Sequence, residues 1–139
     1  MLLRLALPFE PVPSYAVLGA ELGITASEAH AALRQFLQHG ARYCFPASQG
    51  GMTRGIPTWY AASSLKEQIR QGNDPPPVWP WKNGTTRGLA FYPRYPSVPE
   101  AAARNPALGE RLALFDAVRG GSAREQALAV ALLEERLQP

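Results

Sequence analysis

Residues 73–99, NDPPPVWPWKNGTTRGLAFYPRYPSVP, limit what this chain can fold into more than any other stretch. They hold seven of its 14 prolines, at positions 75, 76, 77, 80, 93, 96 and 99. Because proline lacks a backbone N–H and clashes with the preceding helical turn, the segment cannot form one long helix. Large apolar side chains alternate with the prolines, so we expect the segment to wrap over a core. Lys82–Asn83–Gly84–Thr85 is expected to form a turn between two short strands.

The last third of the chain carries the clearest helical pattern. Pro106–Val118 is expected to form one helix, with Gly120–Gly121 as a turn. Ser122 and Glu125 form a capping-box pair that begins a second helix, which can run to about Leu137. We therefore expect a C-terminal helical hairpin. The inward positions are predicted to be Leu108, Leu112, Phe115, Val118, Leu128, Ala131, Leu132 and Glu135.

Two short helices joined by a glycine turn are predicted near the N-terminus, after residues 1–9, which could form a short helix or strand. Ser14 is the expected N-cap of the first helix, and Gly23 its C-cap. Thr25 and Glu28 form another capping-box pair, so the second helix is expected to begin at residue 26 and run to residue 39. Its apolar stripe is predicted to be Ala29, Ala32, Leu33, Phe36 and Leu37.

A β-hairpin is predicted after this helix. Residues 41–47 have the composition of a strand, residues 48–55 of a glycine-rich loop, and residues 56–62 of a returning strand, with Arg54 near the tip. A short helix is expected over residues 63–71. The sequence thus predicts an α+β fold in which helices flank a hairpin and a Pro-rich extended segment.

Residues 14–35, SYAVLGAELGITASEAHAALRQ, resemble the helix-turn-helix of bacterial winged-helix regulators, MarR-like proteins among them. The resemblance rests on packing positions held by Leu18, Leu22, Gly23, Ile24, Ala29 and Leu33. Residues 36–137 resemble an uncharacterised bacterial family that carries an N-terminal winged-helix segment. The resemblance implies that residues 1–62 form a helix-turn-helix followed by a β-hairpin that serves as the wing. Residues 63–139 are then a Pro-rich wrap and a helical hairpin, packed with the first part as one unit.

This resemblance implies binding to double-stranded DNA, with the second helix in the major groove and the hairpin beside the backbone. The expected contacts are Thr25, Ser27, His30 and Arg34 from the helix and Arg42, Thr53 and Arg54 from the wing. Each has an ordinary role as well, since Thr25 is a helix cap and His30 and Arg34 suit a solvated helix face. The prediction of DNA binding therefore depends on these residues occurring together with the glycine turn and the hairpin. Regulators of this kind commonly dimerise to read paired half-sites, so a homodimer is expected.

Composition narrows the other possibilities. The net charge of +3 suits an anionic partner without requiring one. The single cysteine, Cys44, excludes an internal disulfide, and with His30 and His39 it makes no clustered zinc-ligand set, so neither a metal nor another cofactor is expected. No nucleophile or phosphate-loop motif is present, which argues against an enzyme. No apolar run is long enough to span a membrane, and we expect a cytoplasmic protein.

Two alternative functions remain open from the sequence. The first is a protein-interaction module, such as an antitoxin that binds and neutralises a toxin, with large aromatic side chains as anchors. The plainer role of those aromatics is to cover the core. The second is single-stranded nucleic-acid binding through Arg87 and Arg94 beside stacking rings. The anchors of the first alternative would be Trp79, Trp81, Tyr92 and Tyr95.

Overall fold

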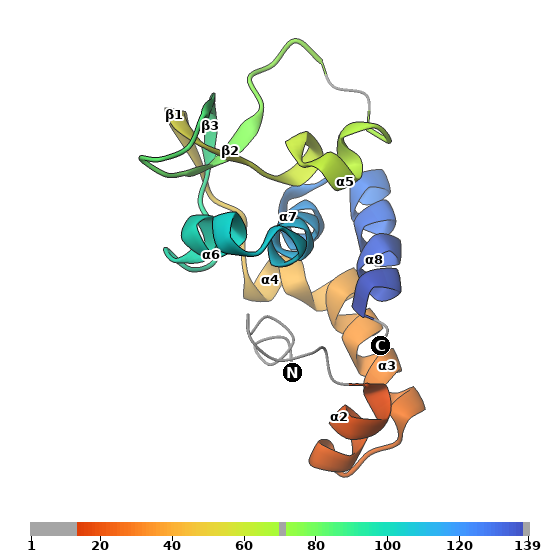
Figure 1. The fold of residues 1–139 in the computed structure, drawn as a ribbon. Coiled ribbons are helices and arrows are strands. Elements are labelled where there is room, and N and C mark those ends of the chain that lie inside the picture. The colour runs from red at the N-terminus through yellow and green to blue at the C-terminus, as the bar shows by residue number, and fades with distance from the viewer. Residues whose placement is uncertain (1–13, 70–71, 138–139) are drawn as a thin grey trace.

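A computed structural model describes residues 14–69 and 72–137 of the chain (Figure 1). The element expected within residues 1–9 lies outside the described residues. The described part combines helices with a small three-stranded sheet, which confirms the α+β class. Its elements are α2 (Tyr15–Leu22), α3 (Ala26–Gln35), a π-helical turn (Phe36–Gly40), α4 (Ala41–Cys44), β1 (Gln49–Pro57), a 3-10 turn (Trp59–Ala61), α5 (Ser63–Lys66), β2 (Pro77–Pro80), β3 (Thr86–Phe91), α6 (Val98–Arg104), α7 (Pro106–Gly120) and α8 (Ala123–Leu137).

The two helices predicted near the N-terminus are confirmed, together with their caps. The Ser14 hydroxyl accepts a hydrogen bond from Val17 N at 3.2 Å, and Gly23 ends α2 in the left-handed conformation, with φ of 72°. The Thr25 hydroxyl accepts from Glu28 N at 3.1 Å, while the Glu28 carboxylate accepts from Thr25 N at 2.8 Å. Hydrogen bonds from Thr25 lower the pKa of the Glu28 carboxyl. Local sequence signals thus set both helix starts.

The expected helix stop at Gly40 and the expected strand at residues 41–47 are wrong. Gly40 keeps right-handed helical angles, and the chain continues through the π-helical turn into α4. The reason is the apolar stripe, because Ala29, Leu33, Leu37 and Ala41 recur every four residues and are all fully buried. A spacing of four drifts around an α-helix of 3.6 residues per turn, whereas a π-helical turn takes more residues and keeps Ala41 facing the core.

The hairpin predicted over residues 41–62 is also wrong, since β1 is one continuous strand whose partners come from the Pro-rich segment. It pairs antiparallel with β2, for example Ile56 with Trp79, and antiparallel with β3 from Gln49–Phe91 to Gly55–Thr86. A parallel contact of β2 with β3 closes the three strands on themselves. The two short strands expected on either side of residues 82–85 are confirmed.

Glycines that resemble loop residues in the sequence allow this closure. A Cβ added to Gly55 would lie 1.8 Å from the carbonyl oxygen of Trp79, and one added to Gly88 would lie 2.0 Å from that of Pro76. Neither contact is possible for a real side chain. The side of the sheet that faces the inside of the closed strands, here called the closed side, therefore requires glycine at these two positions. The larger side chains lie on the opposite, outer side of the sheet.

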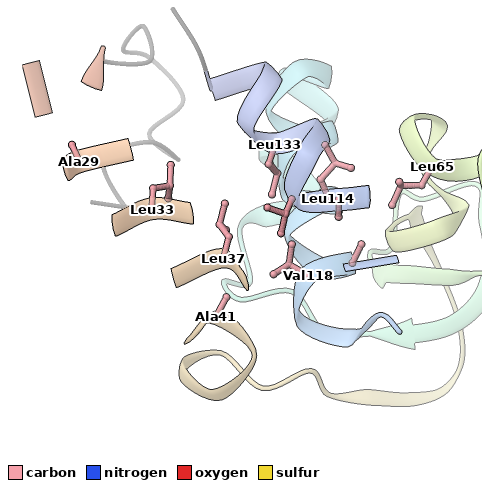
Figure 2. Packing of buried hydrophobic residues seen from close by; sticks show 11 residues of the cluster. Ala29, Leu33, Leu37, Ala41, Leu65, Leu114, Val118 and Leu133 are labelled. Carbon is pink, nitrogen blue, oxygen red and sulfur yellow. The ribbon is translucent and has the colours of Figure 1, made fainter. Parts of the chain in front are cut away.

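The larger core cluster lies between α3, the π-helical turn, α4, α5, α7 and α8. Figure 2 shows the stripe from Ala29 to Ala41 on one side and Leu114, Val118 and Leu133 on the other, with Leu65 beyond them. Residues from both sides of the predicted boundary at 62/63 enter this cluster, although the boundary itself stays a prediction. A smaller cluster joins the sheet to α6 and α7 and consists of Ala62, Trp79, Val98, Ala102 and Ala113.

The C-terminal helical hairpin is confirmed, including its capping box. Ser122 N donates to the Glu125 carboxylate at 2.8 Å, and Glu125 N donates to the Ser122 hydroxyl at 3.3 Å. The predicted inward face of α8 is partly wrong, because Ala131 and Glu135 are exposed. Apolar residues occur on all sides of this part of α8, so the sequence pattern does not define one inward face. The buried positions are Ala129, Val130 and Leu133.

Candidate nucleic-acid interface

Thr25 and Ser27, two of the residues expected to contact DNA, lie at the start of α3. Thr25 is exposed, but Glu28 occupies both its hydroxyl and its backbone N–H. Ser27 is exposed and has no capping role, and Ala31 and Gln35 follow it at intervals of four residues and are exposed too. These three positions share the outward side of the helix. Arg34, seven residues after Ser27, is exposed on nearly the same side, so this side offers hydrogen bonds, van der Waals contact and one positive charge.

His30 and Arg34 are brought together by a carboxylate that the sequence interpretation missed. Glu134 of α8 lies 3.8 Å from His30 Nε2 and 3.3 Å from Arg34 Nε. The His30 ring also stacks on Tyr15, with 4.7 Å between centroids. Burial and the nearby Glu134 raise the pKa of the Tyr15 phenol. Arg34 keeps 55% of its side chain exposed, so its guanidinium reaches solvent while Glu134 holds it in place.

The turn between α2 and α3 is tight and leaves apolar side chains on the surface. Gly19 O accepts a hydrogen bond from Ile24 N at 2.8 Å, and a Cβ on Gly19 would lie 2.5 Å from Ile24 O. The exposed fractions are 48% for Val17, 57% for Leu22 and 37% for Ile24. In Figure 1, α2 and the first turns of α3 project away from the sheet and from α7. The helix-turn-helix is therefore an accessible end of the molecule.

Arg54, expected at a hairpin tip, lies in the middle of β1 and directly opposite Arg87 of β3. Directly opposite residues of antiparallel strands point to the same face of a sheet, and both arginines are exposed. The next pair on that face is Met52 with Leu89. Among the described residues, neither guanidinium forms an ion pair or a hydrogen bond. The structure thus assembles a cation pair of which the sequence interpretation had assigned only one member to DNA.

A sequence signal for this pair exists. The tripeptide Thr-Arg-Gly occurs at residues 53–55 and again at 86–88, and the two copies pair antiparallel around the arginines. Both glycines lie on the closed side of the sheet and both arginines on the outer side. Thr53 also faces away from Arg54 and is half-buried, so it does not belong to the cationic face.

Arg42 is held away from this face. It lies in α4 instead of the expected strand, and its guanidinium donates a hydrogen bond to the carbonyl oxygen of Gly121, at the end of α7. That bond satisfies a helix-end carbonyl that has no partner within its own helix. Arg42 therefore fastens α4 to the turn between α7 and α8.

A buried polar cluster that the sequence interpretation also missed connects α7 to the sheet. Asp116 Oδ2 accepts hydrogen bonds from Thr58 at 2.7 Å and from Trp79 at 2.5 Å, and Asp116 Oδ1 lies 3.0 Å from Arg119. Arg119 also donates to Tyr92 O at 3.0 Å. Burial raises the pKa of Asp116 to about 6, against the lowering effect of Arg119. The sequence signal for this buried cluster is an aspartate and an arginine three residues apart within an otherwise apolar stretch of helix.

An open hollow of about 590 Å³ lies between β1, β2, α5, α6 and α7. Its walls are mainly small apolar residues, and Trp79 is the one large aromatic residue that lines it. The polar residues at this hollow are Ser63, Lys66 and Glu110, and the Ser63 hydroxyl donates to Glu110 at 3.2 Å. Over residues 14–69 and 72–137, no group of three or more His, Cys, Asp and Glu side chains is arranged to hold a metal ion.

Comparison with known proteins adds no relative. No protein-family model matches the chain, and neither a curated protein nor a solved structure matches it. Among the described residues, no helix has the length and apolar character needed to cross a membrane. The helix-turn-helix end and the cationic sheet face must therefore be interpreted from their own chemistry.

Proposed function

We propose that this protein is a sequence-specific, double-stranded DNA-binding regulator of the bacterial winged helix-turn-helix type, acting in the cytoplasm as a homodimer. The observation that carries the proposal is the α2–α3 pair. Its left-handed Gly23 turn, its capping box and the close approach at Gly19 give two braced helices at an accessible end of the molecule. A recognition helix needs that bracing, because its N-terminal half must enter the major groove as a rigid unit.

The polar side of α3 supports a division of roles. Ser27 and Gln35 offer hydrogen-bond donors and acceptors that suit base edges. Arg34, held at 3.3 Å from Glu134 and still largely exposed, suits a phosphate or a guanine. In this proposal the ion pair with Glu134 positions the guanidinium before DNA arrives.

The test uses both members of that ion pair. Arg34→Ala is expected to weaken duplex binding about 5- to 150-fold, as expected for the loss of roughly 1–3 kcal/mol at one contact. Glu134→Gln removes the carboxylate charge that positions the guanidinium but keeps the arginine, so duplex binding is expected to weaken less than in Arg34→Ala. Binding is measured by a mobility shift at low salt, with thermal unfolding as the control for folding. Equal weakening by the two variants would show that Arg34 has only a structural role.

A protein-interaction module, such as an antitoxin, is the second candidate function. It is favoured by the exposed apolar group of Val17, Leu22 and Ile24 around α2, because large exposed apolar side chains suit a protein partner. Trp79, one of the anchors considered from the sequence, is only 1% exposed and therefore serves the core. The test is co-purification with the product of an adjacent gene. Leu22→Ser should abolish that complex, and a complex unaffected by it would contradict this second candidate.

A further inference from the structure

The outer face of the sheet holds two arginines in an arrangement that folding alone does not favour. Arg54 and Arg87 are directly opposite on antiparallel strands, and like charges placed in this way destabilise a sheet. No aspartate or glutamate occurs in residues 48–57 or 76–91, so the strands bring no counter-charge to the pair. Lys82, exposed in the turn between β2 and β3, adds a further cation nearby in the chain. The sheet thus concentrates positive charge that no carboxylate of the described residues neutralises.

The backbone around the pair fixes the face of the sheet on which both arginines lie. The two Thr-Arg-Gly tripeptides run antiparallel, with Thr53 opposite Gly88 and Gly55 opposite Thr86. Because Gly55 and Gly88 must face the closed side, where a Cβ would meet backbone at 1.8 and 2.0 Å, the alternation of the strands forces both arginines outward. A shift of register would drive a side chain into that backbone. The two arginines therefore stay opposite each other on the outer face.

We propose that the Arg54–Arg87 pair binds the phosphate backbone of duplex DNA, as a second contact at the opposite end of the molecule from α2 (Figure 1). This inference rests on the proposed function. Arginine presents a planar fork of N–H donors that matches phosphate oxygens, and two such forks on one face suit one phosphate or two neighbouring phosphates. The adjacent pair, Met52 and Leu89, carries no hydrogen-bonding group to read base edges. The contact is therefore sequence-independent and contributes affinity and orientation.

Other anionic partners fit this face less well. A membrane surface would require a larger apolar or polybasic area than two arginines beside Met52 and Leu89 provide. An acidic peptide strand would pair with an open sheet edge, whereas these three strands close on themselves. Duplex DNA needs only a pair of exposed guanidiniums within reach of its phosphates.

The experiment is the salt dependence of duplex binding by the full chain. Each phosphate contact contributes about 0.9 to the slope of log K against log salt. Arg54→Gln and Arg87→Gln are each expected to reduce that slope by about 1, and the double variant by about 2, equally on two duplexes of unrelated sequence. Arg124→Gln is the matched control, because Arg124 is an exposed arginine on α8 without an ion pair or hydrogen bond among the described residues. It should leave the slope unchanged.

Two further measurements separate binding from folding. The melting temperature of the glutamine variants should be unchanged or slightly raised, since removing one like charge relieves repulsion across the strands. The Arg54→Lys/Arg87→Lys variant keeps the charge without the fork, so it should keep most of the slope but bind more weakly. The lysine variant also tests the inference if the glutamine double variant does not fold. A slope unchanged in the glutamine double variant, or lost in the lysine variant, overturns the inference.

The outcomes distinguish this inference from the proposed function. If Arg34→Ala weakens binding while the sheet variants leave the slope unchanged, the inference fails and the function stands. If the sheet variants reduce the slope while Arg34→Ala has no effect, the inference stands and base reading by α3 fails. If the chain binds phosphatidylserine vesicles or polyglutamate through these arginines more tightly than it binds duplex DNA, the assignment to DNA is overturned. Absence of duplex binding at low salt overturns both.

Discussion

The buried pair of Asp116 and Arg119 leads to a stability prediction with a defined pH dependence. Their side chains are 4% and 3% exposed, and their charged atoms lie 3.0 Å apart. Replacing Arg119 with methionine leaves the Asp116 carboxylate buried without a counter-charge, which costs about 3–5 kcal/mol when one member of a buried pair is removed. A domain of this size has a total stability of about 5–15 kcal/mol, so the loss is large.

The pH dependence follows from the Asp116 pKa. Burial raises that pKa from 3.8 to about 6 in the folded chain. The folded chain therefore binds the proton more tightly than the unfolded chain, and the free energy of unfolding falls as the pH rises from about 4 to about 6. The gap between the two pKa values corresponds to about 3 kcal/mol. In the Arg119→Met variant the opposing cation is absent, so the pKa rises further and the decline continues above pH 6.

The assay is urea unfolding of both proteins at pH 5 and pH 8, followed by tryptophan fluorescence. Arg119→Met should be more destabilised relative to the wild type at pH 8 than at pH 5, where the carboxyl is protonated in both. The double variant Arg119→Met/Asp116→Asn removes the carboxylate and should lose this pH dependence. If the destabilisation is equal at the two pH values, or stays below about 1 kcal/mol at pH 8, the description of a charged buried pair is refuted.

Two further predictions concern the sheet and the helix cap. Gly55→Ala places a Cβ against the carbonyl of Trp79, so it should destabilise the fold by about 3 kcal/mol or more, whereas Gly51→Ala, with open space around it, should be nearly neutral. Equal melting temperatures for these two variants would contradict the closed sheet. Thr25→Ala removes the α3 cap and should cost about 1 kcal/mol in thermal unfolding; no loss would contradict the capping box.

The parts of the fold that sequence could predict are those fixed by residues close together in the chain. The boxes at Thr25–Glu28 and Ser122–Glu125 and the turn at Gly23 each involve partners within three residues. A hydroxyl and a carboxylate at that spacing satisfy free backbone donors at a helix start whatever the rest of the fold does. These starts and the helical hairpin were accordingly predicted correctly.

The parts that failed depend on contacts between distant segments. Gly40 resembles a helix stop, yet burial of Ala41 against the core carries the helix through it. The glycines of β1 resemble a loop, yet Gly55 is where β2 crosses closely. Neither fact can be obtained from local propensity, because each is decided by a segment far away in the chain.

The candidate site shows the same division. Outward positions such as Ser27 follow from helix periodicity. Glu134 beside Arg34 and Arg87 opposite Arg54 require the docking of α8 and the register of β3, which the sequence pattern did not provide. Only the repeated Thr-Arg-Gly tripeptide pointed to the second of these pairs.

The most direct test of the proposed function is whether the wild-type chain binds duplex DNA at low salt, and how that binding changes as salt is added. The wild-type chain should give a clear mobility shift at low salt and a linear fall of log K with log salt, because arginine contacts to phosphate release counterions. A specific duplex should compete better than an unrelated one. Absence of any duplex binding at low salt would contradict the central claim and would leave the apolar surface around α2 as the stronger basis for function.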